Sequence, residues 1–281
     1  MNEKQRNEWR SEYERQLDIA VRGEIGAIRR FYIGQYDKAI AGFLGNNQSR
    51  NFFNIFKFVD FLDIYVQLYR RVGLRFAKWS FKELEGRETK AVSTEDRSEI
   101  WEETFIALGD KIGKSKIVIV QGTALKVLET ELTRFMQDPE FMSLGTEQKA
   151  RILRKRFNLI SQYQSERIAR TESAIAANQA TKTSANDFYG GPDNYDKVWN
   201  HGGTRDPRPS HIALDGVRIS GTERFNVGGE LMDEACSPFA SAGNVINCGC
   251  STTYVRKEPK ESLDPTFALA LATLLVNNDD E

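Results

Sequence analysis

The sequence contains only three cysteines and two histidines among its 281 residues, and no run approaches the roughly 18 apolar residues needed to span a bilayer. The first ten residues carry no apolar signal-peptide core, so we expect a protein of the reducing cytosol without a disulfide framework. A formal net charge of -1 argues against wrapping nucleic acid with the whole surface. A local basic stripe stays open, because the charges are unevenly distributed along the chain.

The first 137 residues carry apolar side chains at helical spacing. A one-sided helix is predicted over residues 7–45 and a long amphipathic helix over about 55–76. Residues 85–98 are polar and are expected to connect two helices at the surface.

The following segment contains one ambiguous stretch. Ser98 is a candidate N-cap for a third helix, and Thr123 for a fourth, which should stop before Asp138 and Pro139. Between the two caps, the β-branched stretch K-I-V-I-V-Q at residues 116–121 fits either a short strand or a buried helix turn, and periodicity does not decide between them.

A further helix is predicted over residues 146–180, with Glu147 placed favourably at its N-terminal dipole end. It is the most positive element of the chain, and its cations are a candidate nucleic-acid-binding stripe that would contact phosphates irrespective of sequence. The stripe consists of Lys149, Arg151, Arg154, Lys155, Arg156, Arg167 and Arg170.

Two alternatives for this helix stay open. The cations could simply form a solvated face, with five apolar side chains turned inward, namely Ile152, Phe157, Leu159, Ile160 and Ile168. Arg170, Thr171 and Glu172 could instead contribute a buried or interfacial ion pair.

Beyond residue 180 the helical periodicity disappears, and short β-type pieces occur around residues 217–219, 245–246 and 252–255. The predicted fold class is α+β, with a mainly α-helical N-terminal two-thirds followed by a small irregular β-containing Cys/His module. The predicted boundaries give a helical domain at 1–184, the module at 185–257, and a tail at 258–281. Residues 264–276 of the tail predict a short apolar helix.

The module holds every cysteine and histidine of the chain between Trp199 and Cys250. His211, Cys248 and Cys250 are candidate ligands of a metal ion, zinc in particular, and either His201 or Cys236 could complete a tetrahedral set. The alternative is that the cysteines are small buried apolar residues and that His211 only hydrogen-bonds a loop.

A catalytic role for the same stretch is the weaker interpretation. A cysteine and a histidine could act as nucleophile and base, oriented by Asp206 or Asp215, but no nucleophile elbow, P-loop or H-E-x-x-H motif is present. Three arginines near His211 could bind phosphate or pair with these aspartates; they are Arg205, Arg208 and Arg218. We therefore favour a structural role for the stretch.

Four separated motifs occur in a fixed order along the second half of the chain. They are Arg167, Arg170, Thr171 and Glu172, then Trp199, then Arg205, Arg208, His211, Asp215 and Gly216, then Asn247, Cys248 and Cys250. This order resembles the phage Mu protein F-like family of minor head proteins, and the resemblance extends from about Gly122 to Tyr254. The sequence departs from the family pattern at Gly249, where arginine is usual, and at Asp206, where an acid would precede the arginine.

The resemblance implies a structural protein of the virion and not an enzyme. It implies a place in the capsid interior near the portal, after assembly in the host cytoplasm, with the portal protein and inner capsid surface as partners. It also implies sequence-independent contact with packaged double-stranded DNA and no membrane partner. The alternative function is a metal-dependent nuclease or Cys-His hydrolase that acts during DNA packaging.

Overall fold

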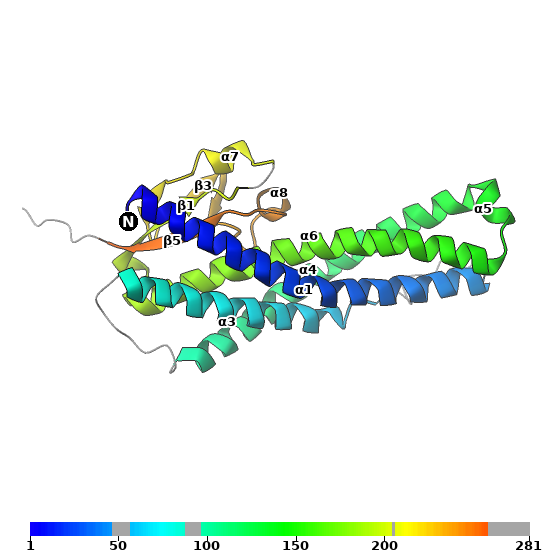
Figure 1. The fold of residues 1–281 in the computed structure, drawn as a ribbon, viewed down its shortest axis with the longest axis horizontal. Helices are drawn as coiled ribbons and strands as arrows, with labels where there is room; N and C mark the ends of the chain where they lie inside the picture. The colour runs from blue at the N-terminus through cyan, green and yellow to red at the C-terminus, as the bar shows by residue number, and fades with distance from the viewer. Residues whose placement is uncertain (47–56, 88–96, 204–205, 258–281) are drawn as a thin grey trace, which may run out of the picture.

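The computed structural model describes residues 1–46, 57–87, 97–203 and 206–257. The molecule is elongated, with long helices running along its longest axis and small sheets gathered near the end where the chain begins (Figure 1). None of the helices in these ranges combines the length and apolarity needed to cross a membrane.

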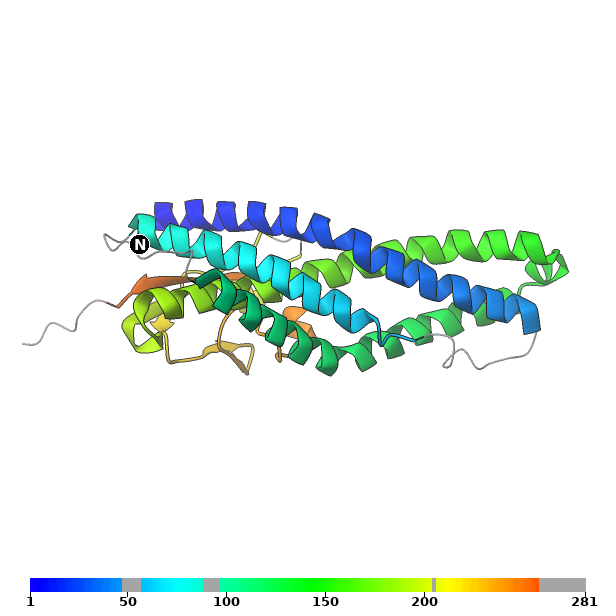
Figure 2. The ribbon, with the colours of Figure 1, turned by 90° about the horizontal axis from the view of Figure 1, so that it is seen from below.

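Four long helices form the body of the protein. They are α1 (Glu3–Asn46), α3 (Phe61–Arg87), α4 (Ser98–Met136) and α6 (Thr146–Tyr189). Helices α1 and α6 lie along one another, and α3 packs against both α4 and α6 (Figure 2). At 1.5 Å per residue, each 44-residue helix, α1 and α6, is about 66 Å long. The predicted helices at 7–45 and 146–180 are confirmed, and the one predicted from residue 55 begins at Phe61 in the part of the chain that the structure describes.

Helix α4 corrects two predictions. It runs without interruption through residues 116–121, so this stretch is neither a strand nor a buried turn, and Val118 and Ile119 are 72% and 69% exposed. Thr123 is not an N-cap, because its hydroxyl donates to the carbonyl of Ile119 inside the helix. The cost of β-branched residues in a helix is a few tenths of a kcal/mol each, which the packing of so long a helix outweighs.

The packing of α3 on α4 depends on glycine. A Cβ added at Gly109 would lie 2.9 Å from the Cβ of Tyr69, and one added at Gly73 would lie 2.3 Å from the ring of Phe105. The helices therefore approach closely enough to bury Phe105 and Ile112 completely.

The helix boundaries agree with the sequence at Asp138 and differ from it at Ser98. The N-cap of α4 is Arg97, so the predicted cap at Ser98 was one residue late. The α4 helix ends before Asp138, whose carboxylate accepts from two backbone N–H groups of the short helix α5 (Pro139–Ser143). Helix α6 ends at Tyr189 and is capped by Gly190, whose φ of 79° favours glycine.

A three-stranded antiparallel sheet in the order β2-β1-β5 follows α6. It consists of β1 (Tyr195–Asn200), β2 (Arg218–Ser220) and β5 (Ser251–Arg256). A hairpin of β3 (Phe225–Val227) and β4 (Glu230–Met232) lies between β2 and β5 in sequence. The helical body followed by small sheets beside a His/Cys group confirms the predicted fold class.

Short helical turns connect these strands: η2 (Pro192–Asn194), α7 (Pro209–Ile212) and α8 (Ala242–Val245). The β-type piece predicted at 245–246 is therefore wrong, because Val245 closes a helical turn. The predicted boundary near residue 185 stays a prediction, and α6 runs through it. The connection at residues 88–96 and the apolar tail helix at 264–276 fall outside the described residues.

Candidate metal centre

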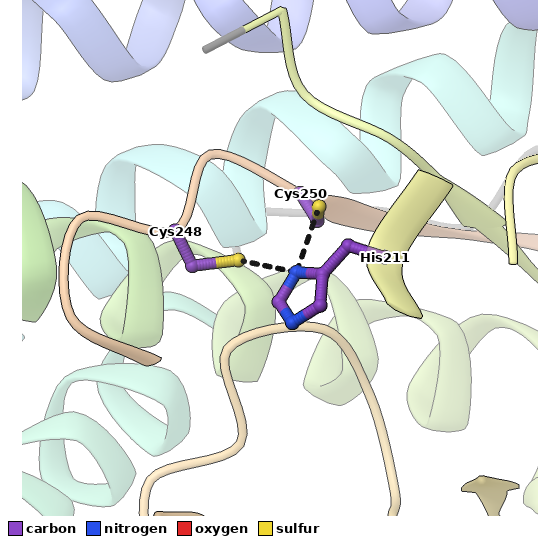
Figure 3. Close-up of side chains that lie close together, drawn as sticks. All are labelled: His211, Cys248 and Cys250. Carbon is purple, nitrogen blue, oxygen red and sulfur yellow. Dashed lines mark hydrogen bonds between the residues drawn. The ribbon is translucent and has the colours of Figure 1, made fainter. Parts of the chain in front are cut away.

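His211, Cys248 and Cys250 converge in the interior of the sheet-containing part of the molecule. The Nδ1 atom of His211 lies 3.5 Å from the Sγ atom of each cysteine (Figure 3). The three side chains are only 2%, 2% and 3% exposed. The grouping predicted from the sequence is thus present, in a space closed to solvent.

Two segments bring these side chains together. His211 lies on α7, which begins with Pro209, and Arg208 before it donates to the carbonyl of Ile246, next to the cysteine segment. Cys248 and Cys250 immediately precede β5. Because β5 pairs along its whole length with β1, the position of the cysteine segment is fixed by the sheet.

The backbone passes very close to itself at this site. A Cβ on Gly202 would lie 2.2 Å from the carbonyl oxygen of Gly249, which is backbone and cannot rotate away. Glycine at 202 therefore allows the segment after β1 to lie directly on the loop that carries both thiols.

The hydrogen bonds of Asn244 define the tautomer of His211. The amide nitrogen of Asn244 donates to Glu230 and to the carbonyl of Val227, so its Oδ1 is left to accept. His211 Nε2 lies 3.3 Å from that oxygen and therefore carries the ring proton. The lone pair of Nδ1 then points toward the two sulfurs, the orientation of a metal-ligating histidine.

The spacing of the three atoms matches zinc. With Zn–S near 2.3 Å and Zn–N near 2.05 Å, a tetrahedral site separates sulfur from nitrogen by about 3.6 Å and sulfur from sulfur by about 3.8 Å. The two observed sulfur–nitrogen separations are 3.5 Å, and all three atoms lie within 4.8 Å of one another. His211, Cys248 and Cys250 could therefore hold a metal ion such as zinc.

As thiols, the two cysteines would be unreactive. A hydrogen bond with the Cys236 thiol and burial raise the pKa of Cys248 well above its usual range. A hydrogen bond with Cys248 and burial do the same to the pKa of Cys250. A nucleophilic cysteine needs the opposite shift, so the geometry disfavours the Cys-His hydrolase interpretation.

Helix α6 forms the floor of the site through Asn178. Its side-chain nitrogen donates to the carbonyl of Cys250 at 3.1 Å and to the hydroxyl of Tyr13 at 2.9 Å. Two turns toward the N-terminus, the hydroxyl of Thr171 accepts from the backbone N–H of Asn247. The cysteine segment is thus hydrogen-bonded to α6 at both of its ends.

Other motif residues shape the loop before α7 and the turn after it. Trp199 is completely buried with its ring edge-on to His211. Gly216 adopts a φ of 78° and donates its N–H to the carbonyl of Trp199, so this turn requires glycine. Asp215 accepts from the backbone N–H of His201 and from the guanidinium of Arg6 on α1. His201 is therefore held by its backbone and is not among the grouped ligands.

The sequence left two ion pairings open, and the structure shows other partners in both. Glu172 is buried and pairs with Lys116 of α4, while Tyr69 of α3 donates to it at 2.8 Å; Arg170 is exposed on another face of α6. Arg218 pairs with Asp196 and not with Asp206 or Asp215. Arg205 falls outside the described residues.

The basic stripe divides into paired and unpaired cations. Arg156 forms a two-pronged ion pair with Glu131 of α4, and Arg154 lies 3.5 Å from Asp37 of α1. Lys149 lies over the ring of Phe141 and Arg167 over Tyr163. Among the described residues, no ion pair is recorded for Arg151, Lys155 or Arg170, and all three are exposed.

The inward face of this helix also differs from the prediction. Ile152 and Leu159 are 38% and 56% exposed, while Phe157 is buried against the ring of Tyr36. The buried side chains follow the line along which α6 contacts α1, which the sequence of α6 alone does not reveal.

Sequence reasoning missed Asn178, Tyr13 and Lys116. The sequence gave a weak signal for Asn178, because it lies among alanines in the middle of a helix. An asparagine side chain there competes for the backbone hydrogen bonds of the helix, so its presence indicates a specific hydrogen-bond partner. Tyr13 and Lys116 gave no such signal, since their partners are distant in sequence.

The fold and the site together define an elongated helical protein with a buried Cys/His group beside a small antiparallel sheet. Residues 142–253 match the family model of the phage Mu protein F like protein, so the chain carries a phage Mu protein F-like domain. The match begins in α5 and ends in β5, so it includes all of α6 together with the Cys/His group. Neither the curated proteins nor the solved structures gave a match.

Proposed function

We propose that this chain is a structural minor head protein of a tailed double-stranded DNA phage, held in the capsid interior near the portal, where it assists head assembly. The observation that supports the proposal is the Mu F-like domain at residues 142–253. Its family-matching residues Thr171, Gly216 and Asn247 have structural roles in this fold, as hydrogen-bond partners and in a turn.

The proposed partners are the portal protein and the inner capsid surface. Mass spectrometry of precursor and mature heads should find the protein at low copy number, and the tagged protein should co-purify with the portal. Absence from both kinds of head would contradict the proposal.

We further propose a non-enzymatic role for the Cys/His group. His211, Cys248 and Cys250 are enclosed, whereas a catalytic metal keeps an open position for water or substrate. His211→Ala and Cys248→Ala should therefore lower the melting temperature. The alternative is tested by assaying the wild type for cleavage of DNA or of an ester. If the wild type shows such activity, and either substitution removes it without lowering the melting temperature, the nuclease or hydrolase function is favoured.

The exposed cations of α6 are proposed to contact packaged DNA. Arg151 and Lys155 lie one turn apart, and Arg170 follows Lys155 by 15 residues, or about 22 Å along the helix. Such an arrangement would meet phosphates without reading bases. The affinity for DNA should be modest, because Arg154 and Arg156 are already paired with acidic side chains of the protein.

A salt titration tests this contact. Wild-type binding to DNA of mixed sequence should weaken as salt rises, with a logarithmic slope of about -0.9 for each phosphate contacted. The variant Arg151→Gln/Lys155→Gln/Arg170→Gln should bind at least tenfold more weakly with a shallower slope. Lys114→Gln, which removes an exposed cation on α4, should bind as the wild type does. No binding by the wild type at low salt, or equal binding by the triple variant, would refute the contact.

A further inference from the structure

The three grouped ligands leave a fourth tetrahedral position to be explained. Zinc sites with three protein ligands are typically catalytic and expose the fourth position to water. Here the ligand side chains are 2% to 3% exposed, so bulk water does not reach the space between them. A buried zinc ion at this position needs a fourth ligand from the protein.

Cys236 is the available ligand. It lies after β4, is 0% exposed, and its Sγ is 3.6 Å from the carbonyl oxygens of both Cys248 and Cys250. The other histidine, His201, has no place in the group, since Asp215 holds its backbone at the surface side of the loop.

We propose that this protein binds one structural zinc ion through His211 Nδ1 and the sulfurs of Cys236, Cys248 and Cys250, with Cys236 closing the site. The Cys236 sulfur stands outside the set of atoms that lie within 4.8 Å of one another, so binding requires it to turn toward them about its Cα–Cβ bond. Each of the three thiols releases a proton, and His211 binds in its neutral form. The occupied site then carries one net negative charge.

The proposed ion would join three segments that are separated along the sequence. His211 comes from α7, Cys236 from the turn after β4, and Cys248 with Cys250 from the entry to β5. The β3–β4 hairpin is a separate two-stranded sheet and does not pair with the β2-β1-β5 sheet. A metal ligand at the end of β4 would therefore attach the hairpin to the rest of the module.

The number of sulfurs bound to zinc is the decisive measurement. Full-length protein purified from zinc-supplemented cells should contain one zinc per chain, and its X-ray absorption fine structure should fit three sulfurs and one nitrogen. Cobalt substituted for zinc should give the visible bands of a tetrahedral site with strong thiolate charge transfer. A wild type that takes up neither metal, or a fit with two sulfurs, would overturn the proposal.

Substitution then assigns the fourth ligand. Cys236→Ser should bind zinc with one sulfur fewer and should lose more than the 10-fold to 100-fold in affinity typical of a change outside the ligand set. Ser237→Ala is the matched control, because it removes a neighbouring hydrogen bond to Glu234 without touching a sulfur. Unchanged affinity in Cys236→Ser would overturn the role of Cys236, and if that variant fails to fold, the sulfur count of the wild type still decides.

Discussion

The side-chain oxygen of Asn178 accepts a hydrogen bond of 3.0 Å from the backbone N–H of Thr252. The same side chain donates to the carbonyl of Cys250, so one amide on α6 satisfies two backbone polar groups at the start of β5. Both the amide and its partners are buried. Helix and sheet are therefore joined at the position where the candidate metal ligands lie.

Asn178→Ala should lower the free energy of unfolding by about 3 kcal/mol. The substitution leaves the Thr252 N–H and the Cys250 carbonyl buried without their partner, and each such group costs about 1–3 kcal/mol. Urea denaturation followed by circular dichroism measures the loss. Gln162→Ala, at an exposed position of the same helix, should change stability by less than about 0.5 kcal/mol. Equal stability of the two variants would contradict the bridging role.

Lys116→Met should destabilise the protein by about 3 kcal/mol, because it leaves the buried carboxylate of Glu172 with the Tyr69 hydroxyl as its one remaining hydrogen-bond partner among the described residues. Lys114→Met offers a matched control two residues away, where an exposed pair with Asp110 contributes less than about 1 kcal/mol. Thermal melts of both variants at neutral pH give the comparison. A smaller effect for Lys116 than for Lys114 would show that Glu172 does not need its cation.

The pair between Glu131 and Arg156 predicts a pH dependence. The hydrogen bonds from Arg156 lower the pKa of Glu131 below its usual value of 4.5, against the opposing effect of burial. The ionised pair therefore stabilises the fold fully above the unfolded-state pKa, and this contribution is lost as the pH falls through the lowered folded-state pKa. In Arg156→Gln, the carboxyl of Glu131 should titrate closer to 4.5.

Carbon-13 NMR of the Glu131 carboxyl checks this shift directly. The titration of Glu12, whose pKa is lowered to about 2 by hydrogen bonds from Arg15 and Gln16, should not change in the same variant and serves as the internal control. An unchanged midpoint for Glu131 would mean that Arg156 is not its main partner in solution.

Gly202→Ala should open the cysteine loop. Its new Cβ would meet the Gly249 carbonyl at 2.2 Å, so the loop must move and the buried thiols should react faster with an aromatic disulfide reagent. Gly203→Ala is the control, since its nearest contact would be an ordinary 3.9 Å to Glu14. Equal thiol reactivity in the two variants would contradict the close packing of the loop.

Much of the helical body was predictable because its apolar residues repeat with the helical period, as in residues 7–45. The conformation of residues 116–121 was not predictable, because their β-branched side chains suit a strand locally. The long contact between α3 and α4 favours the helix instead. The exposed Ile152 and Leu159 show the same limit. Which side of α6 is buried depends on α1, which lies more than a hundred residues away.

The candidate site was predictable as a set of residue types and not as a geometry. Both histidines and all three cysteines of the sequence lie between Trp199 and Cys250, which predicted that His211 would lie close to Cys248 and Cys250. The Asn178 floor, the Gly202 contact and the Asn244 hydrogen bond arise from pairings between distant segments, so sequence spacing carries no information about them.

The contact between Arg6 and Asp215 spans 209 residues. During synthesis at 5–20 residues per second, the start of α1 waits about 10–40 s before Asp215 exists. Tyr13 likewise waits for its partner Asn178 on α6, which is made 165 residues later, or about 8–33 s at the same rate. Newly synthesised chains are consequently most exposed to aggregation before the second half appears, so the yield of folded protein should respond to the rate of translation.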